Sequence, residues 1–483
     1  MKLRKTKIVA TIGPAVSSKD KLTKLIEAGV DVVRFNFSHG TSEDHINCAA
    51  MVRDISRAMH CSIGILCDLQ GPKVRIGKFE KGSVQLTSGD LFILDGSCEL
   101  GNQERVGLDY KTLPNEVDES TILLLDDGRV VMRVDKVIAQ QIYCTVISGG
   151  KLSNNKGINK QGGGLAAEAL TAKDYEDINT AVMLGADFIA VSFPRSAADI
   201  ELARKLIAEA GGHAHVIAKI ERAEAIACLD EIIDASDSVM VARGDLGVEV
   251  GDALVPGLQK RIIRLAKNKN KTVITATQMM ESMISSPIPT RAEVSDVANA
   301  VLDGTDAVML SAETATGLYP LETISAVNRI CIEAEYELAL QVSEVPDVRQ
   351  FTKIDESIAM AASYVAEHLP IKAVVAFTQS GASVLWLSRS DILAPIYAAS
   401  PESNTRRRMK LYRGVYPFPL RTNSQEINDV LLSVESELID KGVVQKGDLI
   451  IAMIGEPFAK AGSTNTLKIL TIGSIQKSLD FIV

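Results

Sequence analysis

Ile217-Ala218-Lys219-Ile220-Glu221 and Met240-Val241-Ala242-Arg243-Gly244-Asp245 are two apolar stretches that each end on charged residues. Residues two apart in an extended strand share a face, so Lys219 and Glu221 are expected to point the same way. The same rule predicts a shared face for Arg243 and Asp245. Glu221 and Asp245 suit a divalent metal, and an amine beside them suits a phosphoryl group or another oxyanion. The pattern therefore predicts a metal-assisted site where the two stretches end.

Eight short apolar runs alternate with amphipathic stretches along much of the chain. The predicted strands are Lys7–Gly13, Asp31–Ser38, Ser62–Leu69, Phe188–Phe193, Val216–Glu221, Ser238–Asp245, Thr272–Gln278 and Ala307–Glu313. The predicted helices between them include Ser18–Ala28, Ser42–Met59, Ala172–Leu184, Ala197–Ala210 and Ala292–Leu302. This alternation is typical of an α/β fold of the parallel (β/α)8 TIM barrel type. In such a barrel, catalytic groups gather at the C-terminal ends of the strands, where the unusual polar residues fall.

The alternation is interrupted between the third and fourth strands. Short alternating runs fill residues 71–165, and Asp127-Gly128 is a hairpin-turn signal, so we expect an inserted small β-barrel domain that caps the mouth. On its return path, Gly162-Gly163-Gly164 is either a hinge or a plain flexible loop. Helices and strands alternate again near the C-terminus and predict a further α/β domain. The expected bounds are 1–70 and 166–340 for the barrel, 71–165 for the cap and 350–483 for the C-terminal domain.

Composition narrows the class of protein. The formal net charge is −9 and the pI is near 5.4, which argues against a general affinity for nucleic acid or an anionic membrane. No run approaches the roughly 18 apolar residues of a membrane span, and residues 1–7 lack the apolar stretch of a secretory signal, so we expect none. The seven cysteines are scattered without metal-ligand spacing. We therefore expect a cytoplasmic protein that binds anionic ligands through local cations.

Polar residues also mark the ends of other predicted strands. Arg34, Asn36 and Ser38 share one face of the second strand, where the arginine is either a phosphate ligand or part of a salt bridge. Asp68 ends the third strand, either as an inward carboxylate or as a helix cap. Thr277 ends the seventh strand, is expected to face the mouth and suits a carboxylate ligand.

Several turns favour the binding of anions. Gly244-Asp245-Leu246-Gly247 is expected to turn into a short helix whose free N–H groups seat an anion. In the last domain, the loop Thr378-Gln379-Ser380-Gly381-Ala382-Ser383 lies between a strand and a helix and is either a phosphate cradle or an ordinary helix cap. Arg406-Arg407-Arg408 with Lys410 is interpreted as a solvated or interface cluster rather than a nucleic-acid site.

Segments spread over nearly the whole chain resemble the signatures of the pyruvate kinase family, in that family's order. They are Lys7-Ile-Val-Ala-Thr-Ile-Gly-Pro14, Arg34-Phe-Asn-Phe-Ser-His39, Lys156-Gly-Ile-Asn159, Lys219-Ile-Glu221, Ala242-Arg-Gly-Asp-Leu-Gly247, Ala276-Thr-Gln-Met-Met-Glu-Ser-Met283 and Ala307-Val-Met-Leu-Ser-Ala-Glu-Thr314. Asp68-Leu-Gln-Gly-Pro-Lys73 and Leu152-Ser-Asn-Asn-Lys-Gly157 look most like bacterial members of the AMP- and sugar-phosphate-responsive type. The resemblance implies a glycolytic kinase that transfers the phosphoryl group of phosphoenolpyruvate to ADP, giving ATP and pyruvate.

The resemblance also implies a role for each candidate residue. Glu221 and Asp245 would bind Mg²⁺ or Mn²⁺, and Lys219 would stabilise the transferring phosphoryl group and the enolate. Arg34 would hold the substrate phosphate. The substrate carboxylate would lie against Gly244, Asp245 and Thr277, and the nucleotide would contact Asn36, His39, Arg75 and Lys156. The family further implies a homotetramer and a phosphorylated allosteric effector, which we expect at the Thr378–Ser383 loop.

One position departs from the pattern of many family members. Those members bind K⁺ through residues matching Asn36, Ser38, Asp68 and the Leu69 carbonyl, and they carry a glutamate where this chain has Lys73. An ammonium there can supply the positive charge itself. Our hypothesis is that Lys73 replaces the ion, which puts K⁺ dependence in doubt.

Two other functions fit part of the pattern. A metal-dependent lyase or aldolase acting on pyruvate-like enolates also needs Lys, Glu and Asp around a metal, but the inserted domain and the nucleotide-facing Arg75 and Lys156 count against it. A silent metabolite-binding regulator is disfavoured because no expected catalytic side chain is missing. The tail after Asn465 carries no motif that we can interpret.

Overall fold

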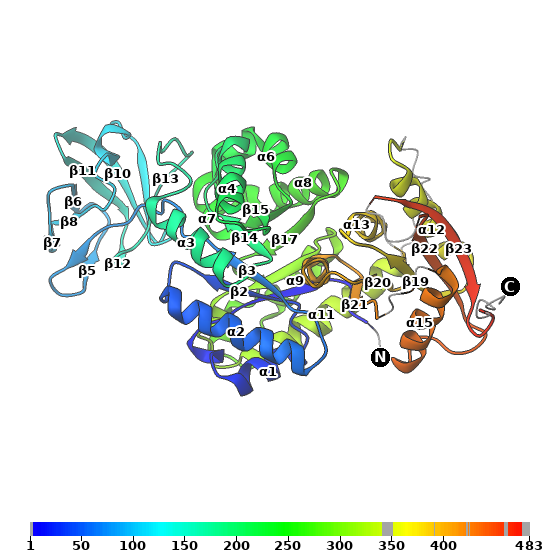
Figure 1. The fold of residues 1–483 in the computed structure, drawn as a ribbon. Helices are drawn as coiled ribbons and strands as arrows, with labels where there is room; N and C mark the ends of the chain where they lie inside the picture. Colours follow the sequence, from blue (N-terminus) through cyan, green and yellow to red (C-terminus); the bar gives the residue numbers. More distant parts are fainter. Residues whose placement is uncertain are drawn as a thin grey trace.

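The computed structural model describes residues 3–340, 351–390, 392–421, 424, 426–457 and 462–475. Three bodies lie in a row: a β-rich cap at one end, a barrel in the middle and an α/β domain at the other end (Figure 1). Within these ranges, no helix is both long and apolar enough to cross a membrane. Residues 476–483 of the tail lie outside the described residues.

The middle body is a closed parallel barrel of eight strands. They are β1 (Lys7–Thr11), β2 (Val32–Asn36), β3 (Gly64–Asp68), β14 (Phe188–Val191), β15 (His215–Ile220), β16 (Ser238–Ala242), β17 (Thr272–Ala276) and β18 (Ala307–Leu310). Strand β1 pairs with both β2 and β18, which closes the barrel. The predicted (β/α)8 barrel is confirmed.

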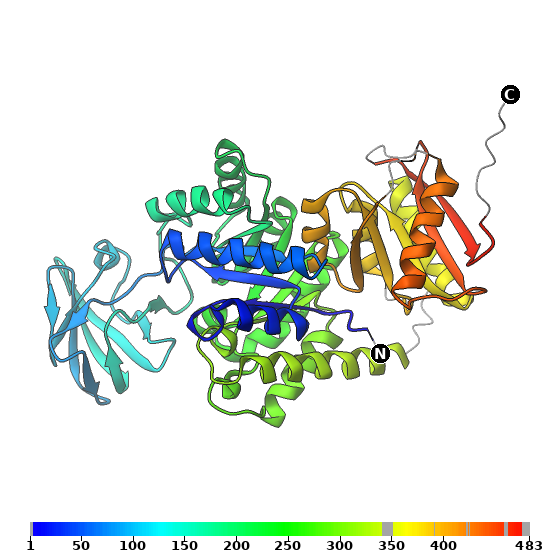
Figure 2. The same ribbon diagram turned by 60° about the horizontal axis from the view of Figure 1, so that its bottom comes forward.

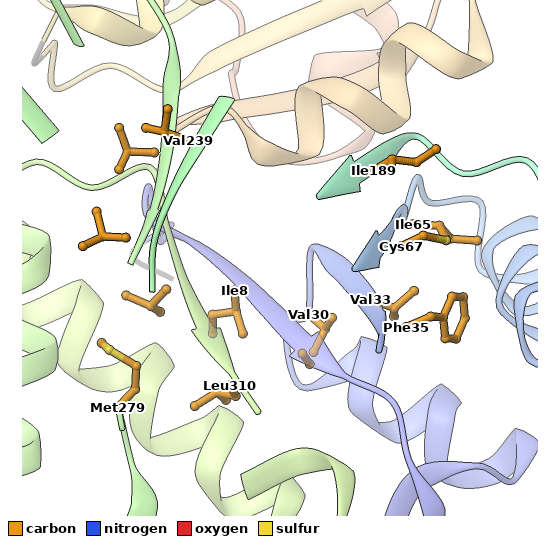
Figure 3. Close-up of a cluster of buried hydrophobic side chains, with 14 of the residues drawn as sticks. Ile8, Val30, Val33, Phe35, Ile65, Cys67, Ile189, Val239, Met279 and Leu310 are labelled. Atoms are coloured by element: carbon orange, nitrogen blue, oxygen red, sulfur yellow. The ribbon is translucent and has the colours of Figure 1, made fainter. Parts of the chain in front are cut away.

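The barrel strands are apolar on both faces because helices cover them from outside. Ile8, Val33, Phe35 and Ile189 belong to one buried cluster between strands and helices (Figure 3). The helices are α1 (Lys19–Glu27), α2 (Ser42–Ala58), α3 (Ala172–Met183), α4 (Ala197–Glu209), α5 (Ala223–Ala227), α6 (Leu229–Ala235), α7 (Arg243–Val250), α8 (Val255–Asn268), α9 (Arg291–Leu302), α10 (Ala312–Ala315) and α11 (Pro320–Leu340). Helix α11 runs along the side of the barrel toward the α/β domain (Figure 2).

The sixth barrel strand is shorter than predicted. β16 ends at Ala242, and α7 begins at Arg243. The two-residue rule for strands therefore does not apply to Arg243 and Asp245, and the prediction that they share a face is wrong. The Arg243 guanidinium instead donates to the Thr277 carbonyl oxygen at 2.7 Å and pairs with Asp296 at 2.6 Å.

The inserted cap follows β3 and precedes α3. Its main sheet has six strands in the order β13-β9-β10-β11-β6-β8, and β12-β5 and β4-β7 form short ladders. The strands are β4 (Lys78–Phe79), β5 (Ser83–Leu86), β6 (Leu91–Asp95), β7 (Leu100–Gly101), β8 (Arg105–Gly107), β9 (Ile122–Leu125), β10 (Val130–Ile138), β11 (Gln141–Ser148), β12 (Gly150–Ser153) and β13 (Ile158–Lys160). The predicted turn at Asp127-Gly128 joins β9 to β10, with the positive φ values of 56° and 84° that such a hairpin turn requires.

The C-terminal domain is built on a five-stranded sheet in the order β21-β20-β19-β22-β23, with β23 antiparallel. Its elements are α12 (Ile354–His368), β19 (Ile371–Phe377), α13 (Ala382–Arg389), β20 (Ile396–Ser400), α14 (Ser403–Arg408), β21 (Val415–Pro419), α15 (Ile427–Asp440), β22 (Leu449–Gly455) and β23 (Thr464–Thr471). The sequence did not predict β21, which contains Pro417 and Pro419. It lies at the edge of the sheet, where a strand tolerates prolines.

Four aspartates lie at the floor of the barrel, at the N-terminal ends of alternate strands. Asp31, Asp187, Asp237 and Asp306 directly precede β2, β14, β16 and β18, respectively. Each carboxylate accepts a backbone N–H from the second residue of a neighbouring strand, in turn Ile8 at 3.1 Å, Ile65 at 2.9 Å, Val216 at 2.8 Å and Val273 at 2.9 Å. The aspartates thus satisfy backbone donors where the strands begin.

Cations of the C-terminal domain bind three of these aspartates. The pairs are Lys410 with Asp31 at 2.6 Å, Arg407 with Asp187 at 2.8 Å and Arg389 with Asp306 at 3.0 Å. Arg408 also contacts His215 Nε2 on β15 at 2.7 Å. The Arg406–Lys410 stretch is therefore an interface cluster, one of the two interpretations left open by the sequence. These contacts hold the α/β domain against the barrel floor.

We predict that Arg389→Ala destabilises the protein by about 3 kcal/mol, because it leaves the buried Asp306 carboxylate without its cation. Arg389 and Asp306 are 4% and 1% exposed in their side chains. Urea unfolding followed by the fluorescence of Trp386, the single tryptophan, measures the change. The matched control is Arg57→Ala, which breaks a pair with Asp54 that is 78% and 58% exposed and should cost less than about 1 kcal/mol. Equal losses in the two variants would contradict the prediction.

Candidate active site

A cavity of about 190 Å³ lies at the mouth of the barrel. Four cationic and three acidic side chains line it: Arg34, Lys73, Arg75, Lys219, Asp68, Glu221 and Asp245. The remaining lining residues are Asn36, Ser38, His39, Leu69, Gln70, Ser192 and Phe193. The fold thus brings together most of the residues that the sequence singled out, from strands far apart along the chain. Gly244, Thr277 and Lys156 do not line this cavity.

Lys219 and Glu221 lie at the end of β15 and contact each other, as the strand pattern predicted. The Lys219 ammonium lies 2.8 Å from the Glu221 carboxylate and 3.3 Å from Asp68, and it donates to Ser192 Oγ at 2.7 Å. Burial works against the charge of Lys219, but the carboxylates of Asp68 and Glu221 outweigh it and raise the pKa of the lysine. Lys219 is therefore a firmly held cation.

Asp68, at the end of β3, bridges two cations. Its carboxylate accepts from Arg34 Nε at 2.7 Å and lies 3.3 Å from the Lys219 ammonium. Burial would raise the pKa of Asp68, but Lys219 and Arg34 lower it below the usual range. Asp68 is thus an inward carboxylate and not a helix cap. Arg34 forms the salt bridge that the sequence left open, yet it still lines the cavity.

Glu221 and Asp245 are the two carboxylates that could hold a divalent cation. Glu221 is 1% exposed, and its pKa is raised because burial, joined by the nearby Asp245, outweighs the opposing Lys219. Asp245, in the first turn of α7, pairs with Lys73 at 3.0 Å. Among the described residues, no group of three or more His, Cys, Asp or Glu side chains is placed to hold a metal. Two carboxylates fit Mg²⁺ or Mn²⁺, since Mg²⁺ binds to one or two carboxylates together with waters and substrate phosphates.

Lys73 lines the same cavity as the residues expected at a K⁺ site, and it pairs with Asp245. Its ammonium is 3.0 Å from Asp245 and 3.9 Å from Asp127. Burial opposes its charge, but Asp245 and Asp127 outweigh it and raise the pKa of Lys73. The four residues expected to bind K⁺ through their oxygens all line this cavity: Asn36, Ser38, Asp68 and Leu69. Two of those oxygens already accept hydrogen bonds, because Asn36 Oδ1 takes the Ser38 N–H at 3.1 Å and the Leu69 carbonyl takes the Ser192 hydroxyl at 2.7 Å.

Gly244 and Thr277 bind each other beside the cavity. The Gly244 N–H donates to Thr277 Oγ1 at 2.8 Å. The sequence predicted a free N–H donor in this turn, and for Gly244 that prediction is wrong. Thr277 has a φ of 68°, which is rare for a β-branched residue. Arg243 stabilises this turn by its hydrogen bond to the Thr277 carbonyl. Backbone strain of this kind is concentrated at functional sites.

The residues expected to contact a nucleotide come from both barrel and cap. Asn36, His39 and Arg75 line the cavity, and Arg75 also donates to the Asn155 carbonyl in the cap at 3.1 Å. Lys156 instead pairs with Asp126 of the cap at 2.7 Å. The structure therefore brings three of the four together and leaves Lys156 at the edge.

The return path of the cap contains three glycines in left-handed conformation. Gly162, Gly163 and Gly164 have φ values of 83°, 78° and 87°. These positive φ values favour glycine at all three positions, and a Cβ atom at Gly163 would also lie 2.8 Å from the Glu224 carboxylate. The Gly162 N–H donates to the carbonyl of Glu249 on α7 at 3.0 Å. The segment has the conformation that suits a hinge, and its motion stays a prediction.

Sequence reasoning missed three residues of the cavity, Gln70, Ser192 and Phe193. Ser192 and Phe193 directly follow β14; Ser192 accepts from the Lys219 ammonium, and the Phe193 N–H donates to Glu221 at 2.9 Å. Their position at the C-terminal end of the fourth barrel strand was the available signal. Neither a serine nor a phenylalanine is unusual at a strand end, so the residue types did not indicate a functional role.

The Thr378–Ser383 loop joins β19 to α13 in the C-terminal domain. Thr378, Gln379, Ser380, Ala382 and Ser383 line a cavity of about 70 Å³ there. Gly381 has a φ of 89°, and its N–H donates to Thr378 Oγ1 at 2.8 Å, just before α13 begins. The loop thus forms the start of a helix and also lines a cavity, which leaves the cradle interpretation in place.

A barrel with a β cap, a C-terminal α/β domain and a charged cavity at its mouth defines a class of multidomain barrel enzyme. The family model described as pyruvate kinase, barrel domain, matches residues 3–324, and the model described as pyruvate kinase, alpha/beta domain, matches residues 356–470. The chain belongs to the pyruvate kinase family. It is accordingly a kinase of glycolysis, and the lyase and silent-regulator interpretations are set aside.

Individual relatives agree with this assignment. Pyruvate kinase II of Salmonella typhimurium is 51% identical over 477 residues, which cover 98% of this chain and 99% of that one. Pyruvate kinase of Haemophilus influenzae is 51% identical over 460 residues, covering 94% and 96% of the two chains. The crystal structure of a pyruvate kinase from Cryptosporidium parvum matches with a TM-score of 0.87 and 32% identity, over 97% of this chain and 96% of that one.

Proposed function

We propose that the cavity at the barrel mouth transfers the phosphoryl group of phosphoenolpyruvate to ADP, forming ATP and pyruvate. The observation that carries this proposal is the contact of Lys219 with Glu221 at 2.8 Å beside Asp245, at the C-terminal ends of the barrel strands. A fixed cation next to two carboxylates suits the transfer of a charged group between two anions.

Charge balance supports this reaction. Both substrates are polyanions, whereas the four cations of the cavity are nearly cancelled by its three carboxylates. Mg²⁺ or Mn²⁺ held by Glu221 and Asp245 would supply the missing positive charge and polarise the phosphoryl oxygens. We therefore assign the divalent-metal positions to these two residues.

The chain's own residues would bind and orient the substrates. Arg34 lines the cavity while Asp68 holds its guanidinium, so it is placed to hold the substrate phosphate. Lys219 would stabilise the charge that develops on the phosphoryl group and on the enolate. We assign the substrate carboxylate to the backbone N–H groups of Gly244 and Asp245 and to the Thr277 hydroxyl, an assignment that requires the hydrogen bond between Gly244 and Thr277 to open when the substrate binds.

The nucleotide would bind between barrel and cap, at Asn36, His39, Arg75 and Lys156. Three of these line the cavity, and Lys156 would join them if the cap moves about Gly162–Gly164. We also propose that the chain assembles as a homotetramer. Exposed apolar side chains on the C-terminal domain, such as Ile354 and Tyr364 of α12, fit subunit contacts of this kind.

We predict that Lys219→Met lowers kcat by at least about a hundredfold and leaves phosphoenolpyruvate binding largely intact. A unit charge pair at about 4 Å in an effective dielectric near 20 is worth roughly 4 kcal/mol, or about three decades in rate. A coupled assay of phosphoenolpyruvate with ADP measures the loss. The control is Lys205→Met, whose lysine is 70% exposed on α4. Near-normal kcat in Lys219→Met would refute the assigned role.

We further propose that the Lys73 ammonium takes the place of K⁺. Its location in the cavity, with a raised pKa, supports a permanent positive charge there. Its pairing with Asp245 places that charge beside the proposed metal ligand.

Activity in buffer containing tetramethylammonium as the only monovalent cation should therefore rise less than about tenfold when KCl is added. Lys73→Glu should make the rate depend on K⁺, because it removes the internal cation. Lys78→Glu, at an exposed lysine of the cap, serves as the control. Strong K⁺ stimulation of the unmodified chain would contradict the proposal.

We propose that the Thr378–Ser383 loop binds the phosphate of an allosteric effector. The loop lines a cavity and precedes α13, and the N-terminus of a helix favours an anion. Trp386 lies on the same helix and provides a local probe.

Of AMP, ribose 5-phosphate and fructose 1,6-bisphosphate, at least one should change Trp386 fluorescence and lower the phosphoenolpyruvate concentration needed for half-maximal rate. Ser380→Asp should abolish both responses, since it places a negative charge in the loop. Ser357→Asp, at an exposed serine of α12, should keep them. A response that survives Ser380→Asp would place the effector elsewhere.

A further inference from the structure

The turn formed by Ser192 and Phe193 lies between β3 and β15 at the mouth of the barrel. The Ser192 hydroxyl accepts a hydrogen bond from the Lys219 ammonium at 2.7 Å and donates one to the Leu69 carbonyl oxygen at 2.7 Å. Ser192 is 1% exposed. Its single hydroxyl proton is directed to the Leu69 carbonyl at 2.7 Å rather than to the more distant Asp68 carboxylate at 3.5 Å, and its oxygen accepts from Lys219.

Packing fixes the position of this turn. Phe193 is a non-glycine residue with a φ of 56°, a conformation that the surrounding structure must hold in place. Its N–H donates to Glu221 at 2.9 Å. On the opposite side, a Cβ atom at Gly71 would lie only 2.8 Å from Ser192 Cβ, so the two turns are in close contact. The hydroxyl thus has little freedom to move away from Lys219.

Ser192 differs in charge from the other partners of the ammonium. Lys219 has three protons, and the structure gives it three acceptors: Glu221, Asp68 and Ser192. Two of these are carboxylates, which cancel the positive charge that a phosphoryl group needs. A neutral hydroxyl fixes the direction of the ammonium without reducing its charge.

The two carboxylates also have other partners. Asp68 is shared with Arg34, and we assign Glu221 to the divalent cation. Of the three acceptors that the described residues give Lys219, Ser192 is therefore the one that binds neither Arg34 nor the proposed divalent cation. We propose that Ser192 is a positioning residue, which acts on phosphoryl transfer by holding the Lys219 ammonium. This inference rests on the role of Lys219 proposed above.

Ser192→Ala should lower kcat about tenfold or more, which is the factor expected for losing a hydrogen bond to a charged group. KM for phosphoenolpyruvate should change by less than about threefold, because the residues assigned to substrate binding are untouched. Ser236→Ala is the matched control, since it also removes a buried hydroxyl of the barrel, one that donates to Ile232 at 2.6 Å on the floor side. It should leave kcat within about twofold of the unmodified chain.

The double variant separates a positioning role from a general structural one. If Ser192 acts through Lys219, adding Ser192→Ala to Lys219→Met should change the residual kcat by less than about twofold. A further tenfold loss in that background would overturn the proposal, and so would an unchanged kcat in the single variant. Should Ser192→Ala not fold, Ser192→Cys keeps a similar volume with only a weak acceptor and should show the same split between kcat and KM.

The outcomes also distinguish this inference from the proposed function. Near-normal turnover by Lys219→Met would remove the role of the lysine itself. A crippled Lys219→Met beside an unaffected Ser192→Ala would leave that role intact and reject the positioning by Ser192.

Discussion

The pairing of buried charges at the barrel mouth is the constraint on which the site depends. A carboxylate removed from water must have a cationic or hydrogen-bonding partner, and each of the three in this cavity has one. Asp68 binds Arg34, Glu221 binds Lys219 and Asp245 binds Lys73. The charges of the site therefore hold one another in place. The same pairing leaves the cavity close to neutral, so the two polyanionic substrates of the proposed reaction would need additional positive charge, which is the physical case for proposing a divalent metal.

Buried carboxylates at the floor of the barrel also have hydrogen-bonding or cationic partners, and there the pairing has a structural role. The aspartates before alternate strands bind backbone donors of neighbouring strands, and three of them also bind cations of the C-terminal domain. One element links this floor to the small cavity of that domain: α13 begins at the Thr378–Ser383 loop and ends at Arg389, the partner of Asp306. Since Asp306 directly precedes β18, a rigid helix separates the loop from a strand of the catalytic barrel.

Local pattern was sufficient to predict most of the fold, because buried strands and amphipathic helices show their periods over a few residues. All eight barrel strands, the inserted β domain and the α/β domain follow from such runs. The pattern failed where the chain leaves a strand. Extending the period of two past Ala242 gave Arg243 the wrong direction, because α7 had already begun. The prolines of β21 concealed an edge strand, since a sequence does not state which strand will lack a neighbour.

Some residues of the candidate site were likewise predictable from the sequence, and others were not. Lys219 and Glu221 were predictable because they share one strand. Polar residues at the ends of other strands indicated Arg34, Asp68 and Asp245, and the resemblance to a family supplied their expected roles. Contacts between distant segments were not predictable from local pattern. Lys73 and Asp245 are 172 residues apart, and the sequence offered no reason to pair them. Ser192 is a common residue made important only by its neighbours, because Lys219 comes from the next strand, and Leu69 and Gly71 come from the segment that directly follows β3. A side chain whose role is to orient another has no signature of its own, so it becomes visible only when the fold places both on one side of the same cavity.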